Sequence, residues 1–329
     1  MRVAAIDCGT NSIRLLVADA GGPRTGAGLD GSQLREVDRR MRIVRLGEGV
    51  DATGRLSDTA LARTYRACEE YAAVLDELHP DALRFVATSA TRDAANADVF
   101  TAGVRRRLGV DPEVVSGAEE AQLSFTGALA GFAGQSPPGP VLVVDIGGGS
   151  TEFVLGSIAG DDATGDGDGD GSPLGVSVDI GCVRLTERVL SGDPPDGAQV
   201  AAATHLVDAA IDEAARAVPL EQARTLLGLA GSVTSVAAAV MQLDRYERSR
   251  IHHAHLAADR VHQVTGDLLT MTRAERSTLP WLHPGRVDVI GAGALVLDRI
   301  LTRVGPTLAT PEVIASEEDI LDGIALSLL

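Results

Sequence analysis

Two short polar segments, Asp7–Ser12 and Asp145–Ser150, carry the same residue types at the same spacing. Each begins with aspartate, has glycine two positions later and ends with serine. Glycine lets a phosphate approach the backbone closely, and successive N–H groups in such a turn can form an anion-binding concavity. The aspartate supplies the kind of oxygen ligand that Mg²⁺ prefers. Each segment therefore has the parts needed to bind a phosphate and a metal ion, although one copy alone would more readily be read as a plain β-turn.

The residues around these segments extend the similarity to whole hairpins. Apolar runs precede them at Val3–Ile6 and Val141–Val144, and apolar runs follow them at Ile13–Ala18 and Thr151–Leu155. An apolar run, a group of turn residues and a second apolar run predict a β-hairpin. The two hairpins align without a gap at an offset of 145 − 7 = 138 positions. This internal repeat predicts two similar lobes.

A pair of glutamates, Glu119 and Glu120, offers a second kind of chemistry. Ser116-Gly117 predicts the start of a helix, and on that helix Glu120 shares a stripe with Ser124, Gly127 and Gly131. Space beside the Glu120 carboxylate would let it orient and deprotonate a water molecule, an effect typically worth about 10²–10⁴ in rate. The alternative is an acidic first turn that only complements the helix dipole.

Two arginines and one further turn are weaker candidates for phosphate contacts. Arg92 follows the end of a predicted strand, and Arg184 follows Gly181-Cys182-Val183. Either could pair with a non-reacting phosphate, or could be a solvated surface residue. Gly228–Ser235 leads from a strand through Gly, Ser and Thr residues into a helix, which fits a phosphate or nucleotide contact as well as an ordinary strand–helix junction.

Composition excludes several other functions. All 29 basic residues are arginine, so the chain has no Schiff-base lysine and no P-loop lysine. A net charge of −17 argues against nucleic acid as a partner. We find no apolar stretch of membrane-spanning length and no signal-peptide pattern, and therefore expect no membrane association. Three widely separated cysteines fit a reducing, cytoplasmic location.

The remaining sequence predicts the elements that position these residues. Ser57 is an expected N-cap of an amphipathic helix, and further helices are expected at Ala95–Leu108 and Ala198–Ala217. Strands are expected at Leu83–Ala87, Pro112–Val115 and Leu226–Ala230, followed mostly by helix. Alternating strands and helices predict an α/β fold. The acidic, glycine-rich segment of about 158–174 is expected to be disordered.

The sequence also resembles a known family, the exopolyphosphatase / guanosine pentaphosphate phosphohydrolase (Ppx/GppA) family of the actin-like and sugar-kinase-like ATPase superfamily. The similar segments, which span nearly the whole chain, are AIDCGTNSIRLL, RLGEGVDATGRLS, VATSATRDAAN, SGAEEA, VVDIGGGSTEFV, GCVRLTE, GLAGSVTS and HPGRVDVIGAGALVL. The resemblance implies two ribonuclease-H-like lobes around a central cleft. We expect one lobe at 1–122 and the other at 123–309, with a C-terminal helix at about 310–329 packing back on the first.

The resemblance also implies roles for individual residues. Glu120 would be the catalytic base. Asp145 and Glu152 would ligate Mg²⁺, with Mn²⁺ as an alternative metal and Asp7 as a further candidate ligand. The residues expected to bind phosphate are Gly147, Gly148, Gly149, Ser150, Asn11, Ser12, Arg92 and Arg184.

Two departures from the family pattern concern substrate preference. The chain stops at Leu329, without the additional helical domains of long members, so it resembles the short, two-domain form. The stretch Asp319–Gly323 lacks an arginine that many members have there. Both departures leave chain-length preference and guanosine-nucleotide specificity open.

We therefore expect a Mg²⁺-dependent exopolyphosphatase that releases the terminal phosphate of polyphosphate. Removal of the 5′-terminal phosphate of guanosine pentaphosphate is the alternative activity. More distant alternatives are a polyphosphate:nucleotide phosphotransferase and a non-catalytic, alarmone-binding regulator of the stringent response. We further expect a homodimer, with an alarmone as a candidate inhibitor.

Overall fold

The computed structural model of the chain describes residues 1–21, 34–132, 137–157 and 172–329. Contacts divide the chain into two compact units: unit 1 comprises Met1–Ala133 and Glu318–Leu329, and unit 2 comprises Gly134–Glu317. The last residues of the chain thus share a unit with the first. The division expected at 122/123 would fall inside a helix that these units keep whole. Most of the acidic segment 158–174, expected to be disordered, lies outside the described residues, namely 158–171.

The sheet of unit 1 has the strand order β3-β2-β1-β4-β5. Its strands are β1 (Arg2–Cys8), β2 (Ser12–Ala20), β3 (Leu34–Ile43), β4 (Ala82–Ala87) and β5 (Glu113–Val114). Strands β1, β2 and β3 form an antiparallel meander, whereas β4 and β5 run parallel to β1. The carboxyl ends of β1, β4 and β5 therefore meet at one edge of the sheet.

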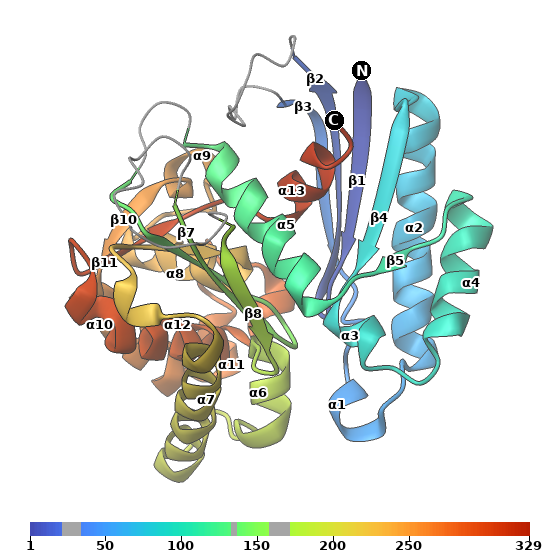
Figure 1. The fold of residues 1–329 in the computed structure, drawn as a ribbon. Helices are drawn as coiled ribbons and strands as arrows, with labels where there is room; N and C mark the ends of the chain where they lie inside the picture. The colour runs from blue at the N-terminus through green and yellow to red at the C-terminus, as the bar shows by residue number, and fades with distance from the viewer. Residues whose placement is uncertain (22–33, 133–136, 158–171) are drawn as a thin grey trace. The chain divides into compact units, whose positions relative to one another are not determined.

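Helices cover both faces of this sheet (Figure 1). Helices α2 (Asp58–Leu78) and α4 (Ala97–Leu108) lie on one face, and α5 (Gly117–Ala130) and α13 (Ile320–Leu326) lie on the other. The short helices α1 (Val50–Thr53) and α3 (Ser89–Arg92) lie at one end of the sheet. Alternate residues of β1 enter two separate cores. Ala4, Ile6 and Cys8 pack with α2 and α4, and Val3 and Ala5 pack with α5 and α13. A strand buried on both faces explains why β1 is a continuous apolar run rather than an alternating one.

Two predicted helix starts are confirmed. Ser57 caps α2, its Oγ accepting a hydrogen bond from the Ala60 N–H at 3.2 Å. Ser116 caps α5 in the same way, accepting from the Glu119 N–H at 3.2 Å. A serine side chain at this position satisfies one of the N–H groups that the first helical turn leaves without a partner. The second cap fixes where the α5 helix begins, and therefore where Glu120 lies.

The sheet of unit 2 has the order β10-β11-β9-β6-β7-β8. Its strands are β6 (Val141–Ile146), β7 (Thr151–Gly156), β8 (Leu174–Val178), β9 (Thr225–Leu229), β10 (Ala254–Ala257) and β11 (Glu312–Ala315). Strands β6, β7 and β8 again form an antiparallel meander, and β9 is parallel to both β6 and β11. The internal repeat therefore extends from the hairpins to the order and direction of five strands.

The helices of unit 2 enclose one large apolar cluster. They are α6 (Cys182–Val189), α7 (Gly197–Ala217), α8 (Ala230–Val240), α9 (Arg248–Ile251), α10 (Ala258–Thr270), α11 (Arg273–Arg276) and α12 (Ile290–Val304), with short 3₁₀ helices at Leu220–Gln222, Pro284–Arg286 and Gly305–Thr307. Strands β10 and β11 interrupt the region read from the sequence as mostly helix. Both have four residues, too few to show a strand period.

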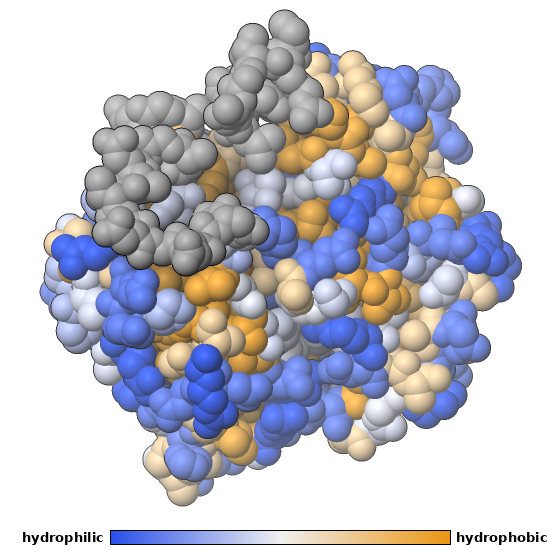
Figure 2. Space-filling view, viewed as in Figure 1, coloured by the Kyte–Doolittle hydropathy of each residue, from blue (hydrophilic) through white to orange (hydrophobic). Residues whose placement is uncertain are grey.

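Polar side chains cover much of the face shown in Figure 2, with hydrophobic side chains scattered between them. Large exposed hydrophobic side chains of the described residues are Met1, Val99, Val114, Leu174 and Tyr246, which are spread along the chain. In the described part of the chain, no helix combines the length and the apolar character needed to cross a membrane.

Candidate functional site

The turns of the two hairpins are closed by the same hydrogen bond. The Gly9 N–H donates to the Ser12 carbonyl at 3.0 Å, and the Gly147 N–H donates to the Ser150 carbonyl at 3.0 Å. The repeated spacing of the sequence thus gives the same backbone turn twice, at the junctions β1–β2 and β6–β7.

In the second hairpin, the start of helix α6 binds the carbonyl groups of the turn. The N–H groups of Cys182–Arg184 donate to the carbonyls of Gly147 and Gly148 at 2.9–3.0 Å, and the Arg184 Nε donates to the Gly149 carbonyl at 2.8 Å. The N–H groups of Gly148 and Gly149 have no partner among the described residues. Backbone N–H groups rarely remain unpaired, so this turn is prepared for an external acceptor such as a phosphate oxygen.

Gly181 makes this contact between the turn and α6 possible. A Cβ at Gly181 would lie 2.5 Å from the carbonyl carbon and oxygen of Gly148, closer than a side chain can approach a backbone. The α6 helix can therefore start directly against the turn. This position places Arg184, in the first turn of α6, beside the Gly147–Ser150 loop.

In the first hairpin, the segment after β3 binds the turn carbonyls in a corresponding way. The N–H groups of Val44 and Arg45 donate to the Asn11 carbonyl at 3.0 and 2.8 Å, and the Gly47 N–H donates to the Thr10 carbonyl at 2.9 Å. The N–H groups of Thr10 and Asn11 are again without a partner within the described ranges. The side-chain Nδ2 of Asn11 is also buried and unpaired there. Ser12, at the start of β2, is half-buried.

Glu120 and Arg92 are brought together in unit 1. Glu120 lies in the first turn of α5 and is 7 % exposed, and its Oε2 accepts a hydrogen bond from the Arg92 Nη1 at 3.0 Å. The same Nη1 donates to the Val115 carbonyl at 3.0 Å. Arg92 therefore links the carboxylate of Glu120 to the backbone before α5. Glu119 points elsewhere and pairs with Arg84 at 2.7 Å, so the two neighbouring glutamates have separate environments.

Asp145 and Glu152 form a pair of buried carboxylates in unit 2. They are direct cross-strand partners in the β6–β7 hairpin and are 7 % and 2 % exposed. Directly opposed residues of an antiparallel pair project from the same face of the sheet. The Ser177 Oγ donates to the Glu152 Oε1 at 2.6 Å. The hydroxyl thereby orients one of the two carboxylates.

These two carboxylates fit a hard divalent cation. Mg²⁺ is commonly held by one or two carboxylates, together with water and substrate phosphates. Two like charges buried side by side also repel each other, and a cation between them would remove that repulsion. The described residues contain no cluster of three or more His, Cys, Asp or Glu side chains that would form a complete cage. The donor set therefore suits a metal ion that shares its coordination sphere with a bound phosphate.

The first hairpin differs at the corresponding position. Asp7 is paired across the strands with Arg14, whose Nη2 and Nε donate to the Asp7 Oδ2 at 2.7 and 2.9 Å. Arg14 also donates to Asp319, which caps α13. Burial raises the pKa of Asp7, whereas Arg14 holds the pKa of Asp319 below its ordinary value despite burial. One guanidinium thus serves two buried carboxylates, and Asp7 is engaged by a cation of the protein itself.

The turn predicted at Gly228–Ser235 lies next to the second hairpin in unit 2. Strand β9 pairs with β6, with Leu229 opposite Asp145, and α8 begins at Ala230 with a positive φ of 66°. A Cβ at Gly231 would lie 1.9 Å from the Cζ of Arg286. Arg286 therefore covers this turn. The sequence analysis did not select it as a site residue, although it lies in HPGRVDVIGAGALVL, one of the segments that resemble the family.

Each unit thus contains one set of the predicted site residues. Unit 1 contains Asp7, Asn11, Ser12, Arg92 and Glu120, and unit 2 contains Asp145, Gly147, Gly148, Gly149, Ser150, Glu152 and Arg184. Within unit 1 the structure joins Arg92 to Glu120. Within unit 2 it joins the glycine loop to Arg184 and places Asp145 opposite Glu152. Sequence reasoning missed Ser177, Arg286 and the double pairing of Arg14.

A family model and proteins of known name match this chain over most of its length. The family model described as "Ppx/GppA phosphatase family" matches residues 26–328. The chain is 47 % identical, over 99 % of its length and 98 % of the relative's, to "Exopolyphosphatase 2" of Mycobacterium tuberculosis.

Solved structures of proteins with these names are also similar to the chain. The crystal structure of an "exopolyphosphatase-like protein" superposes with a TM-score of 0.90 at 43 % identity, covering 100 % of this chain and 98 % of that one. The Ppx/GppA family member of Aquifex aeolicus superposes with a TM-score of 0.74 at 28 % identity, covering 100 % and 97 % of the two chains.

Proposed function

The chain belongs to the Ppx/GppA phosphatase family, and on this premise we propose that it is an exopolyphosphatase that hydrolyses the terminal phosphoanhydride bond of inorganic polyphosphate. The expected α/β class, with two lobes of the actin-like ATPase type, is confirmed by the two sheets and by the structural neighbours. The family covers hydrolases of phosphoanhydride bonds, which agrees with the reading of the hairpins as phosphate-binding turns.

The observation that carries the proposal is the repeated turn. In both hairpins a neighbouring segment binds the turn carbonyls, while the N–H groups of Thr10 and Asn11 and of Gly148 and Gly149 find no acceptor among the described residues. A phosphate group can supply the acceptors that each of these turns lacks. Because the chain has no lysine, backbone N–H groups, arginines and a metal ion must provide all of the phosphate binding.

Glu120 is the proposed catalytic base. In the proposed step its carboxylate accepts a proton from a water molecule while the water oxygen forms a bond to the terminal phosphorus. The bridging P–O bond breaks, and orthophosphate and a polyphosphate shortened by one unit leave. Arg92 holds the Glu120 carboxylate in place through the ion pair at 3.0 Å. Phosphoryl transfer depends mainly on such positioning and on charge neutralisation.

A divalent metal ion is the expected cofactor, and we propose Mg²⁺, with Mn²⁺ as the alternative. Asp145 and Glu152 would hold it, and when bound it would neutralise charge on the phosphate under attack. We do not assign Asp7 to the metal, because Arg14 already neutralises its carboxylate at 2.7 Å. Positive charge from the metal and from Arg92 and Arg184 would also offset the net charge of −17 that opposes a polyanionic substrate.

Phosphate release from polyphosphate tests the proposal, with two neighbouring substitutions. Glu120→Gln should lower turnover by about 10²–10⁴-fold. Glu119→Gln is the matched control, because Glu119 pairs with Arg84 and is half-exposed; this variant should keep its activity. Wild-type turnover in the Glu120→Gln variant would refute the assignment of the base.

The second candidate activity is hydrolysis of the 5′-terminal phosphate of guanosine pentaphosphate, which the family also covers. The Gly231 turn beneath Arg286 is the feature that favours a nucleotide, because it combines a helix start with a cation. Rates on polyphosphate and on guanosine pentaphosphate, measured side by side, decide between them. Arg286→Gln should slow only the reaction with the nucleotide if that candidate is correct.

A further inference from the structure

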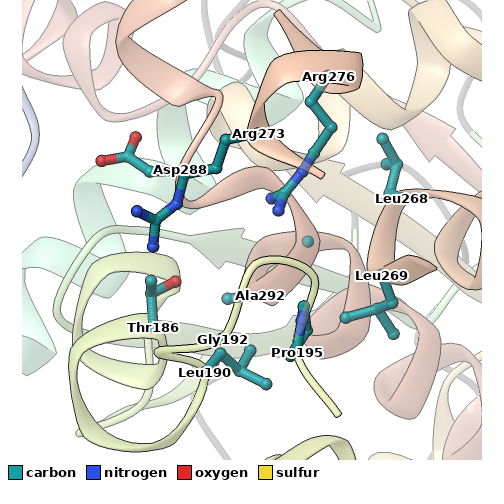
Figure 3. Close-up of a pocket in the computed structure, with 11 residues that line it drawn as sticks. Thr186, Leu190, Gly192, Pro195, Leu268, Leu269, Arg273, Arg276, Asp288 and Ala292 are labelled. Atoms are coloured by element: carbon teal, nitrogen blue, oxygen red, sulfur yellow. The ribbon is translucent and has the colours of Figure 1, made fainter. Parts of the chain in front are cut away.

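Unit 2 contains a pocket outside the two hairpins, lined by residues within 186–195, 268–276 and 288–292. Helix α6 and the segment that follows it form one wall, and α10, α11 and α12 form the others. Figure 3 shows the side chains of Arg273 and Arg276 directed into this space from α11, with the guanidinium of Arg273 toward Thr186. The proposed exopolyphosphatase mechanism uses none of these residues.

Arg276 is a buried arginine whose guanidinium has no close hydrogen-bond partner among the described residues. Its side chain is only 5 % exposed, and its Nε is buried without a hydrogen-bond partner in the described structure. The nearest carboxylate oxygen is the Oδ1 of Asp193, 3.8 Å from Nη2 and beyond hydrogen-bond distance. Burial lowers the pKa of this guanidinium. A buried charge without hydrogen bonds is costly, so such a group is normally satisfied by an ion, by water or by a ligand.

Arg273 adds a second set of donors to the same pocket. Its side chain makes no ion pair with any described residue, and its backbone N–H donates to the Asp193 Oδ1 at 2.6 Å. Asp193 is thus already engaged by the backbone. Asp288 also lines the pocket and has interactions of its own. The two acids offset part of the positive charge, so hydrogen-bond donors, more than net charge, define what the pocket can bind.

Gly291, in the first turn of α12, lies beside these donors. A Cβ at this position would be in van der Waals contact with the Arg276 Nη1, at 3.5 Å. Leu268 and Leu269 form an apolar wall on the side of α10. A planar guanidinium fork matches the two oxygens of a carboxylate or a phosphate. A small oxyanion would therefore supply the acceptors that Arg276 and Arg273 lack.

We propose that this pocket is a binding site for a small oxyanion, either a phosphate or a carboxylate group, held by Arg276 and Arg273. The site is separate from the phosphate-binding turn of the second hairpin. Helix α6 connects the two regions: its first residues bind the turn carbonyls, and Thr186 on the same helix lines the pocket.

Isothermal titration of the full chain tests the proposal, with inorganic phosphate or acetate as the probe and no divalent cation. Arg276→Gln and Arg273→Gln should each weaken binding by about ten-fold or more, since each removes charge-assisted hydrogen bonds. Gly291→Val should weaken it too, because the new side chain fills the space and leaves both arginines intact. Arg245→Gln is the control, because Arg245 is 79 % exposed outside the pocket.

Arg184→Gln separates this site from the turn of the second hairpin, and it should leave the binding that depends on Arg276 unchanged. Binding of acetate alone, with the same dependence on Arg276, would identify a carboxylate ligand, and binding of phosphate alone a phosphate ligand. The proposal is overturned if neither anion binds the wild-type chain. It is also overturned if binding is unchanged in both Arg276→Gln and Gly291→Val.

Discussion

Arg14 in the first hairpin occupies the position that Glu152 occupies in the second. Both lie directly opposite the aspartate that starts the turn, Arg14 opposite Asp7 and Glu152 opposite Asp145. The same backbone unit therefore presents an ion pair in one copy and two carboxylates in the other. The repeat supplies two turns of the same geometry, and in the proposed function this single position decides which of them takes a metal ion.

This relationship predicts the effect of Glu152→Arg. The substitution should give Asp145 the same cross-strand cation that Asp7 has, so the fold should persist while metal binding is lost. We expect metal-stimulated phosphate release to fall by about 100-fold or more, with a melting temperature close to that of the wild type. Activity across a Mg²⁺ titration, together with circular dichroism, measures both. A normal metal response would contradict the assignment of Glu152.

Ser177→Ala is the milder test of the same site. It removes the hydroxyl that donates to the Glu152 Oε1 at 2.6 Å but keeps both carboxylates. Loss of a group that orients a metal ligand typically weakens metal affinity by about 10–100-fold. The expected result is a Mg²⁺ requirement shifted to higher concentration, with turnover at saturating metal largely retained. An unchanged Mg²⁺ requirement would show that this hydrogen bond does not support the site.

Substitution of two buried asparagines should have different effects, one on substrate binding and the other on the stability of the fold. The Asn11 Nδ2 has no partner in the described part of the chain, whereas the Asn96 side chain bonds both the N–H and the carbonyl of Leu56, at 2.8 and 3.0 Å. Asn11→Ala should therefore cost little stability and should lower kcat/KM for polyphosphate. Asn96→Ala should cost about 1–3 kcal/mol, because it leaves buried backbone groups unpaired. Urea unfolding and steady-state kinetics on both variants check this, and the reverse pattern would contradict it.

The carboxylates bound to Arg14 predict opposite pH dependences. The pKa of Asp319 is lowered in the folded chain, so its contribution to stability is complete above its ordinary value of 3.8 and is lost as the pH falls below it. The pKa of Asp7 is raised, so its contribution is complete below 3.8 and is lost as the pH rises through the higher folded value. Thermal melts of Asp319→Asn and Asp7→Asn from pH 3 to pH 7 should therefore deviate from the wild type in opposite directions.

Two helical glycines predict opposite effects of the same substitution. A Cβ at Gly127 of α5 would lie 1.9 Å from the Asp319 carbonyl oxygen, whereas a Cβ at Gly266 of α10 would meet nothing within 4 Å. Gly127→Ala should force α5 and α13 apart and lower the melting temperature. Gly266→Ala should stabilise α10 by up to about 1 kcal/mol, since alanine favours the helix. Equal effects at both positions would contradict the close packing of α5 on α13.

Local patterns made the hairpins and helix starts predictable from the sequence. The turns at Gly9 and Gly147 and the caps at Ser57 and Ser116 depend on residues within a few positions of one another, and the structure has them where they were expected. The strand β3 was missed because it is rich in arginine and acidic residues. Its place at the edge of the sheet explains this composition, since charged side chains on an edge strand discourage pairing with other chains.

The contacts missed from the sequence join distant residues. Arg14 and Asp319 are 305 positions apart, and no local pattern connects them. Arg276 lies in a four-residue helix, where its burial depends on α10 and α12 packing around it. The proposed metal-binding pair depends on a local pattern, since Asp145 and Glu152 lie directly opposite each other in the register of one hairpin. The loss of this pair in the first hairpin was equally visible, in the replacement of glutamate by Arg14.

The attachment of α13 to unit 1 has a consequence for how the protein is made. Unit 1 needs both the first residues of the chain and Glu318–Leu329, whereas unit 2 is the continuous stretch Gly134–Glu317. At a synthesis rate of roughly 5–20 residues per second, the strands of unit 1 wait about 10–40 s for their last helix. During this interval the residues of unit 2 are being synthesised, and the face of β1 that carries Val3 and Ala5 lacks α13. The part of the chain that is synthesised first is therefore the part whose folding is completed last.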